Sequence, residues 1–426
     1  MEALAGFGTP VAICSVMLVA LGFKPIKGAT VALVANTAPV AFGAIAIPIV
    51  TLSQITGLSK HDLGSMVGRQ TPLLALIVPL ILVAIVDGRR GVRQTWPAAL
   101  TGGLAFAVLQ FATSNYISVE LTDIVASLGS AAAVVALLRV WQPAEPMHGR
   151  FAGPRPAIAG ASTHAPALER EVREREERGD PPREVVRAYA PYLIIIAVLG
   201  IAQIGAIHTA LGNATKEFSW PGLHVLNSKG EAPKSVTFKF DYLQAAGTLL
   251  LISGLLTMAV LRVTPGRALR VYGGTLHQLR WAIVTVMSVL SLAYVMNLSG
   301  ETITLGTWAA GAGGFFAFLS PLIGWLGTAV TGSDTSSNSL FGLLQVTAAK
   351  KASIDPVLLA ASNSSGGVVA KMISPQNLAI GAAAVGMAGQ EGELFRKVIG
   401  WSLVLLLFLC VLALLQSVGA LSWMVP

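Results

Sequence analysis

The chain has 426 residues, of which 54% are hydrophobic and only 12% are charged, and its formal net charge is +8. Soluble domains usually contain about 25% charged residues, so this composition excludes an ordinary soluble protein. The apolar residues come in long runs, which predicts an all-α polytopic membrane protein embedded in a lipid bilayer.

Uninterrupted apolar runs and interrupted ones can be told apart along the chain. A helix needs about twenty apolar residues to cross the hydrocarbon core of a bilayer. Such runs predict membrane spans at 72–87, 98–113, 124–141, 189–209, 242–261, 281–297, 303–328 and 399–424. The runs 10–23, 28–57 and 354–390 contain polar residues, Gly or Pro, and predict broken or re-entrant helices.

Composition changes along the chain predict four regions. One loop carries many arginines and glutamates in near balance, which predicts a solvated cytoplasmic linker. The regions are 1–141, a first repeat and the following spans; 142–187, the charged cytoplasmic linker; 188–300, central spans; and 301–426, a second repeat and the final span.

Charged residues inside the apolar regions predict a polar site. Between residues 281 and 349 the only charged side chains are Glu301 and Asp334, and Asp334 lies in a run of small polar residues. Lys371 lies in a similar run that ends at Pro375. A charge at the centre of a bilayer costs about 2.5–3.5 kcal/mol even on the lenient insertion scale. Residues retained at that cost indicate a site within the membrane.

A weak internal repeat supports this interpretation. A shift of 327 residues places Asn36 on Asn363, Thr37 on Ser364 and Pro48 on Pro375. Interrupted helices at matching places in two halves are typical of transporters built from inverted repeats. The free N–H groups at a broken helix can hold a carboxylate, and the freed carbonyls can hold a cation. We therefore expect two inverted repeats with broken or re-entrant helices around one site.

Several motifs in order along the chain resemble the lactate permease family. They are Glu2-x-x-Ala-Gly-Phe-Gly-x-Pro10, Gly22-Phe-Lys-Pro25, Ala35-Asn-Thr-Ala-Pro-Val-Ala-Phe-Gly-Ala44, Gly68-Arg-Gln70, Thr95-Trp-Pro-Ala98, Gln110-Phe-x-Thr-Ser-Asn-Tyr116, Gly324-Trp-Leu-Gly327, Thr331-Gly-Ser-Asp-Thr-Ser-Ser-Asn338, Ser365-Gly-Gly367 and Lys371-Met-Ile-Ser-Pro-Gln376. The resemblance implies proton symport of L-lactate, often with D-lactate and glycolate, by a multi-pass protein of the bacterial inner (plasma) membrane. Family members carry further spans before the first motif, so a truncated, inactive form is one alternative.

The expected site takes its residues from both repeats. We expect Lys371 to pair with the substrate carboxylate, or with Asp334 when the site is empty, and Asp334 to carry the proton. The other expected substrate-binding residues are Asn36, Thr37, Asn363, Ser364, Ser365 and Gly366, and the expected near-site residues are Gly8, Thr9, Ser333, Thr335 and Ser336. Glu2 is given little weight, because it adjoins the terminus.

Each assignment has a structural alternative. Lys371 would then extend its stem to water from a helix end. Asp334 would cap a helix that begins near Ser339. Asn36 and Asn363 would cap helix ends at the two breaks. A sodium-coupled carrier of small carboxylates also remains open, because Asn, Ser and Thr oxygens suit Na⁺ as well.

Other functional classes fit less well. The six histidines share no helix face and the two cysteines lie in apolar stretches, so neither a metal site nor a disulfide framework is predicted. No cluster of catalytic residues and no phosphate-binding loop is found, so neither an enzyme nor a cofactor is expected. The arginines are spread over short loops, which argues against a nucleic-acid partner. A homo-oligomer is left open.

Overall fold

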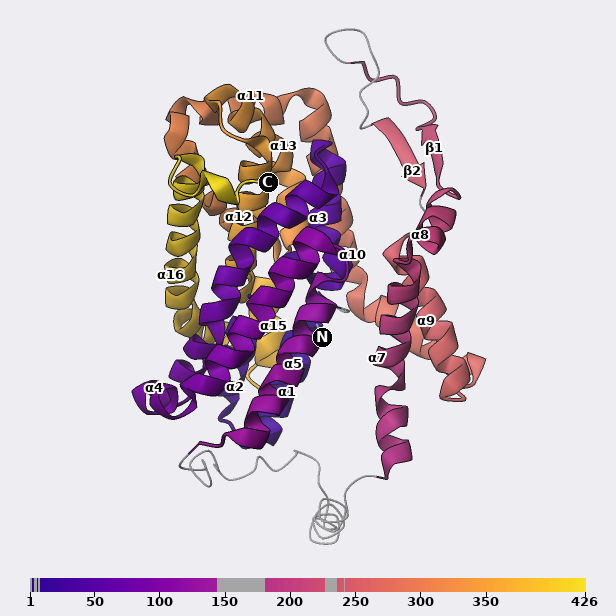
Figure 1. Ribbon diagram of the computed structural model, residues 1–426. Helices are drawn as coiled ribbons and strands as arrows, with labels where there is room; N and C mark the ends of the chain where they lie inside the picture. Colours follow the sequence, from indigo (N-terminus) through magenta and orange to yellow (C-terminus); the bar gives the residue numbers. More distant parts are fainter. Residues whose placement is uncertain (1, 4–5, 7, 144–180, 227–235, 241) are drawn as a thin grey trace. The chain divides into compact units, whose positions relative to one another are not determined.

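The computed structural model describes residues 2–3, 6, 8–143, 181–226, 236–240 and 242–426. The chain divides into two compact units, a larger one from residues 1–153 and 284–426 and a smaller one from residues 154–283. Both consist mainly of helices (Figure 1), which confirms the predicted all-α polytopic class. Most of the predicted linker 142–187 lies outside the described residues.

The larger unit contains every helix that was predicted to be broken. Its first part consists of α1 (Thr9–Ala20), α2 (Pro25–Ala35), η1 (Val40–Phe42), α3 (Gly43–Thr56), α4 (Lys60–Tyr116) and α5 (Thr122–Val140). Its second part consists of the end of α10 (Pro265–Ser299), α11 (Glu301–Ala309), η3 (Ala310–Phe315), α12 (Phe316–Thr331), α13 (Asp334–Ala352), α14 (Pro356–Ala370), η4 (Lys371–Ile373), α15 (Pro375–Ala384), α16 (Glu391–Ser417) and η5 (Ser422–Met424).

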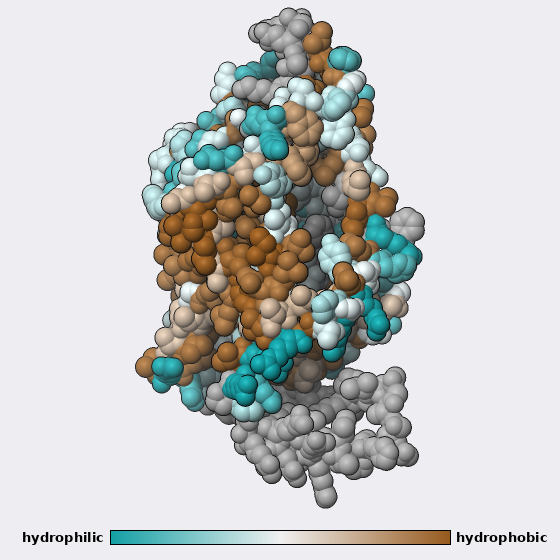
Figure 2. Space-filling model, turned by 90° about the vertical axis from the view of Figure 1, so that its right-hand side faces the viewer, coloured by the Kyte–Doolittle hydropathy of each residue, from teal (hydrophilic) through white to brown (hydrophobic). Residues whose placement is uncertain are grey.

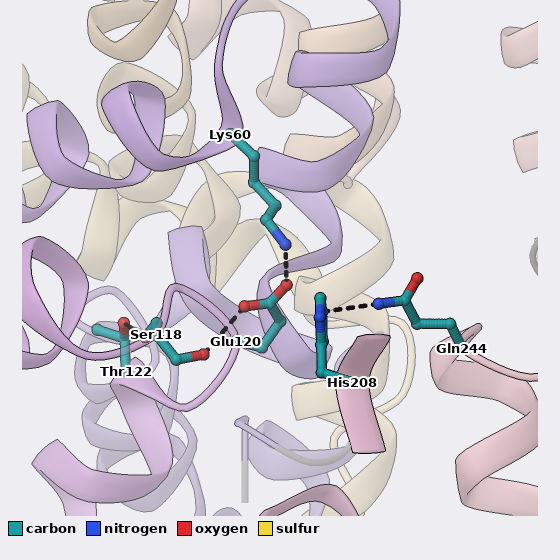
Figure 3. Close-up of polar contacts among 6 residues, drawn as sticks. All are labelled: Lys60, Ser118, Glu120, Thr122, His208 and Gln244. Atoms are coloured by element: carbon teal, nitrogen blue, oxygen red, sulfur yellow. Dashed lines mark hydrogen bonds and ion pairs between the residues drawn. The ribbon is translucent and has the colours of Figure 1, made fainter. Parts of the chain in front are cut away.

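The smaller unit contains α7 (Pro182–Ala202), α8 (Gly205–Gly212), α9 (Ala246–Val260) and the beginning of α10. Helices α7 and α9 pack against each other, and the His208 ring and the Gln244 amide lie 2.7 Å apart (Figure 3). A two-stranded antiparallel sheet joins β1 (Lys216–Ser219) to β2 (Thr237–Phe240). No sequence pattern predicted this small sheet.

The apolar lengths of the described helices fit a membrane. By length and composition five of them could span a bilayer, or six if the bent pair of α2 with η1 and α3 counts as one span. The predicted spans 242–261 and 281–297 correspond to shorter apolar helices, 247–260 and 283–299. Many large apolar side chains are exposed, and hydrophobic side chains gather in the middle of the face seen in Figure 2. Such a surface suits contact with lipid.

The first predicted break lies between α2 and α3. The two helical segments are bent by 66°, and Ala44, Ile45 and Ala46 have positive φ angles of 45°, 63° and 56°. Non-glycine residues in this conformation cost about 1–3 kcal/mol each and persist only where the surroundings enforce it. Here the Ala44 and Ile45 N–H groups donate to the backbone carbonyls of Glu2 and Ala3, at 2.9 and 3.0 Å.

The second break lies between α14 and α15, at Lys371 to Ser374. Pro375 begins α15, where its missing N–H costs nothing, and the Ser374 hydroxyl caps that helix by accepting from the Asn377 N–H at 3.4 Å. We expected the polar break to include Asn363 and Ser364, but both lie inside α14. That prediction was wrong, because these side chains form hydrogen bonds within the core that hold them in a continuous helix.

Helices α12 and α14 approach so closely that only glycine fits at two contacts. A Cβ atom on Gly324 would lie 1.8 Å from the Asn363 carbonyl oxygen, and one on Gly366 would lie 1.9 Å from the Pro321 carbonyl oxygen. Small residues of this kind allow membrane helices to pack backbone against backbone. The expected site residue Gly366 therefore has a packing role.

We expect Gly324→Ala to destabilise the larger unit. The obstructing atom belongs to the backbone and cannot rotate away, so the cost should be at least about 1–3 kcal/mol. Thermal unfolding of the purified protein in detergent measures this loss. Gly400→Ala in α16 is the matched control, because nothing lies within 4 Å of its added methyl group. Equal melting temperatures for the two variants would contradict the close packing.

An ion pair joins the beginning of α4 to the loop before α5. Lys60 pairs with Glu120, whose other oxygen accepts from the Ser118 hydroxyl at 3.0 Å (Figure 3). Burial alone would raise the pKa of Glu120, but the Lys60 charge and the hydrogen bonds outweigh it and lower that pKa.

We expect Glu120→Gln to cost at most about 1 kcal/mol at neutral pH, because the Lys60 side chain is 39% exposed and water screens the pair. Because folding lowers the pKa of Glu120, its ionised carboxylate stabilises the fold at pH values above about 4.3, the pKa of this group in an unfolded chain. This stabilisation is lost as the pH falls through the lower pKa of the folded state. Thermal unfolding of both proteins at neutral and acidic pH should therefore show a difference that disappears in acid. A difference that grew in acid would contradict this sign.

Candidate functional site

A small pocket lies between the two breaks of the larger unit. Its volume of about 40 Å³ has room for about three water molecules. Its walls come from segments far apart in the sequence, with the first part of the chain supplying Glu2, Gly6, Val40, Gly43, Ala44, Ile47 and Pro48, and the second part supplying Gly332, Ser333, Asp334, Thr335 and Lys371. Residues adjoining both predicted breaks thus meet at one cavity.

Lys371 lies in η4 and its side chain faces Glu2. The residue is only 6% exposed, Glu2 is 4% exposed, and the two form an ion pair. The carbonyl of Lys371 accepts from the Asn377 amide and the Ser374 hydroxyl, both at 3.0 Å, and these bonds hold the break. We expected Asp334 to be the partner of Lys371 in the empty site. The structure corrects this, since Glu2 takes that place.

Asp334 is the first residue of α13 and is 3% exposed. Its Oδ2 accepts from the Ser364 hydroxyl at 2.6 Å and from the Asn338 amide at 3.4 Å, while its Oδ1 has no hydrogen-bond partner among the described residues. The cap of α13 is Ser333, whose hydroxyl accepts from the Ser336 N–H at 3.3 Å. The alternative in which Asp334 caps a helix beginning near Ser339 is therefore wrong.

A buried network of amides and hydroxyls supports the Asp334 side of the pocket. The Asn338 amide donates to the Pro48 carbonyl at 3.2 Å, across the two parts of the chain, and to the Ser364 hydroxyl at 3.1 Å. Asn363 donates to the Asn338 side-chain carbonyl oxygen at 3.0 Å and accepts from Gln345 at 3.1 Å. These bonds fix the position of the groups that contact Asp334.

Several expected substrate-binding residues lie behind the pocket wall. Ser364 contacts Asp334 directly, whereas Ser365 donates to the Gln70 side-chain carbonyl oxygen at 2.6 Å. Asn36 and Thr37 are buried at the end of α2, and the Asn36 amide nitrogen and the Thr37 hydroxyl find no partner among the described residues. None of Asn36, Thr37, Asn363, Ser364, Ser365 and Gly366 is among the described residues that line the pocket.

The expected near-site residues divide into two groups. Ser333 and Thr335 line the pocket, and Ser336 is buried beside them. Gly8 caps α1 with a φ of 80°, and a Cβ atom on it would lie 2.5 Å from Ile380, so it packs against α15. Thr9 is exposed. The beginning of α1 therefore supports the second break but does not line the pocket.

Two buried carboxyl groups were missed by the sequence interpretation. Glu2 was given little weight for its place near the terminus, although it opens the first family-like motif. Asp123 falls between the predicted spans 98–113 and 124–141 and was not singled out, yet it is fully buried at the beginning of α5 and accepts from the Gln110 amide at 3.3 Å. An acid directly before a long apolar run was the available signal for Asp123.

These features define a helical membrane protein with a polar pocket between broken helices, an arrangement typical of secondary transporters. The sequence model of the L-lactate permease family matches residues 1–418, and the chain belongs to that family. This confirms the resemblance seen in its motifs and makes the protein a membrane transport protein.

Named relatives match along nearly the whole chain. The glycolate permease GlcA of Escherichia coli K12 is 42% identical, over 98% of this chain and 76% of that protein. The L-lactate permeases of Bacillus subtilis 168 and E. coli K12 are 41% and 40% identical, each over all of this chain and 77% of the relative. No solved structure matches this chain.

Proposed function

We propose that this protein imports L-lactate, with D-lactate and glycolate, by proton symport across the inner membrane of a bacterium. The names of the relatives support lactate and glycolate as substrates. The observation that carries the proposal is the pocket, whose walls contain one lysine, Lys371, and two buried carboxyl groups, those of Glu2 and Asp334. A small anion and a proton are the ligands that suit such groups.

In this proposal Lys371 holds the carboxylate of the substrate. It is the only lysine or arginine among the described residues that line the pocket. A hydrogen bond between an ammonium and a carboxylate is stronger than a neutral one. The hydroxyl groups of Ser333 and Thr335 are placed to bind the substrate hydroxyl.

Asp334 binds a proton in the loaded carrier. Its carboxyl group is buried, and its hydrogen-bond donors among the described residues are neutral. An ionised carboxylate in this position would add a negative charge next to the substrate anion. Protonation of Asp334 removes that charge from the loaded site, where an unpaired buried charge would be costly.

The two breaks are proposed to belong to inverted repeats, in regions 1–141 and 301–426, with 188–300 as central spans. The pocket supports this arrangement because residues near both breaks form its walls. Rocking of one repeat against the other would expose the pocket to each side of the membrane in turn.

The test is uptake of radiolabelled L-lactate and glycolate by proteoliposomes that contain the purified protein. Accumulation driven by an inward proton gradient, without sodium, is expected. Accumulation that requires a sodium gradient at fixed pH would support the sodium-coupled alternative. Absence of uptake and of exchange for both substrates would overturn the proposed function.

A further inference from the structure

Glu2 pairs with Lys371, the residue that is proposed to hold the substrate carboxylate. Its Oε1 pairs with Lys371, while its Oε2 has no partner among the described residues. Both residues line the pocket and both are almost fully buried. A glutamate side chain ends in the same group as lactate or glycolate, so it satisfies Lys371 in the same way.

The first break holds Glu2 in this position. Its backbone carbonyl accepts from the Ala44 N–H, and its side chain lies over Gly43, where an added Cβ atom would be 3.0 Å from Oε1. Glu2 and Lys371 are 369 positions apart in the sequence. The contact therefore joins the two breaks directly.

The charges in the pocket do not allow Glu2 and the substrate to be ionised together at Lys371. The charged or ionisable groups around Glu2, among the described residues, are Lys371 as its partner, Asp334 across the pocket, and Asp123, whose carboxylate interacts with that of Glu2. One ammonium balances one carboxylate. An additional buried carboxylate without a partner costs several kcal/mol.

We propose that Glu2 is a built-in competitor for the substrate carboxylate, and that Glu2 takes up the proton that accompanies the substrate. When the substrate binds, its carboxylate replaces that of Glu2 at Lys371, and the Glu2 carboxylate gains one proton to become a carboxylic acid. Lys371 remains an ammonium throughout. With Asp334 protonated, the pocket is neutral both before and after this exchange. The inference rests on the proposed function and assigns the coupled proton to Glu2, while Asp334 keeps its proton both before and after substrate binds.

The first test compares Glu2→Gln with the wild type in proteoliposomes. The glutamine side chain of this variant cannot lose or gain a charge, so we expect accumulation driven by a proton gradient to fall at least tenfold. Exchange of internal for external substrate needs no net proton movement and should persist, with only the pH dependence that Asp334 contributes. The matched control is Glu120→Gln, which also removes a carboxylate from a lysine but lies outside the pocket, and it should accumulate substrate normally.

Two results separate this inference from the function on which it rests. A wild-type protein that neither accumulates nor exchanges lactate or glycolate would remove the proposed function itself. A wild-type protein and a Glu2→Gln variant that accumulate substrate equally would overturn only the role of Glu2.

A direct proton measurement decides the matter if Glu2→Gln fails to fold. Substrate is added to the purified protein in weakly buffered detergent with a pH indicator, and we expect uptake of about one proton per bound substrate. Asp334→Asn retains Glu2 and should take up the same proton. No uptake by the wild type, or uptake that disappears in Asp334→Asn, would overturn the assignment to Glu2.

Discussion

Replacing Lys371 by alanine is expected to reduce uptake of L-lactate and glycolate by about a hundredfold. Hydrogen bonds to charged groups contribute about 1.5–3 kcal/mol, which corresponds to about 10- to 150-fold in affinity. Lys371 is the only basic side chain among the described residues that line the pocket, so no neighbour there can replace its charge. Uptake into proteoliposomes, normalised to the amount of reconstituted protein, measures the loss.

The alanine variant also leaves Glu2 buried without a partner. Removing one member of a buried ion pair costs about 3–5 kcal/mol, whereas replacing both members by neutral groups is often harmless. The double variant Glu2→Gln with Lys371→Met therefore separates the loss of stability caused by an unpaired Glu2 from the loss of substrate binding caused by the missing lysine. We expect it to fold as well as the wild type and still to show no uptake.

Lys60→Met is the matched control for this experiment. Lys60 also pairs with a glutamate, but at a half-exposed position away from the pocket, so its uptake should be close to that of the wild type. Uptake above about half of the wild-type level in Lys371→Ala would remove Lys371 from the substrate site.

The broken helices could be predicted from the sequence because their signals are local. Pro375 after a polar run, and Asn36-Thr37 followed by Pro39, interrupt stretches that are otherwise apolar enough to span a bilayer. Hydrophobic length and helix-breaking residues act over one or two turns, so a single sequence is sufficient to show them. The structure places breaks after Asn36 and at Lys371 to Ser374.

The position of Asn363 could not be predicted in the same way. An Asn-Ser-Ser run usually favours turns and helix caps, because these side chains compete for backbone hydrogen bonds. In the folded chain the Asn363 amide instead bonds to Asn338 and Gln345. These tertiary contacts override the local preference, and they form only when α13 and α14 pack together.

The partner of Lys371 could not be predicted from the sequence either, because this pairing also depends on tertiary structure. Of the two acids weighed for the site, Glu2 and Asp334, Asp334 is the nearer one along the chain. Pairing with Glu2 depends on the unusual left-handed backbone at Ala44 to Ala46, which positions the carbonyl contacts of Glu2. No sequence pattern predicts three consecutive positive φ angles at non-glycine residues.

Asp334→Asn is expected to make uptake less sensitive to alkaline pH. In the wild type, raising the pH removes protons from the pocket, and an ionised Asp334 would repel the substrate anion from Lys371. If transport requires a group to be protonated, the rate of uptake falls by about tenfold for each unit of rising pH once that group is largely ionised. Asparagine resembles the protonated form of aspartate and cannot ionise, so the variant has one fewer group that must be protonated for uptake.

The initial rate of uptake should therefore be measured from about pH 6 to pH 9, without a gradient across the vesicle membrane. With Glu2 and Asp334 both requiring a proton, the logarithm of the wild-type rate should fall about twice as steeply as that of Asp334→Asn in the alkaline limit. The slope that remains in the variant belongs to Glu2 and should disappear when Glu2→Gln is added. Equal slopes for the wild type and Asp334→Asn would show that transport does not require a proton on Asp334.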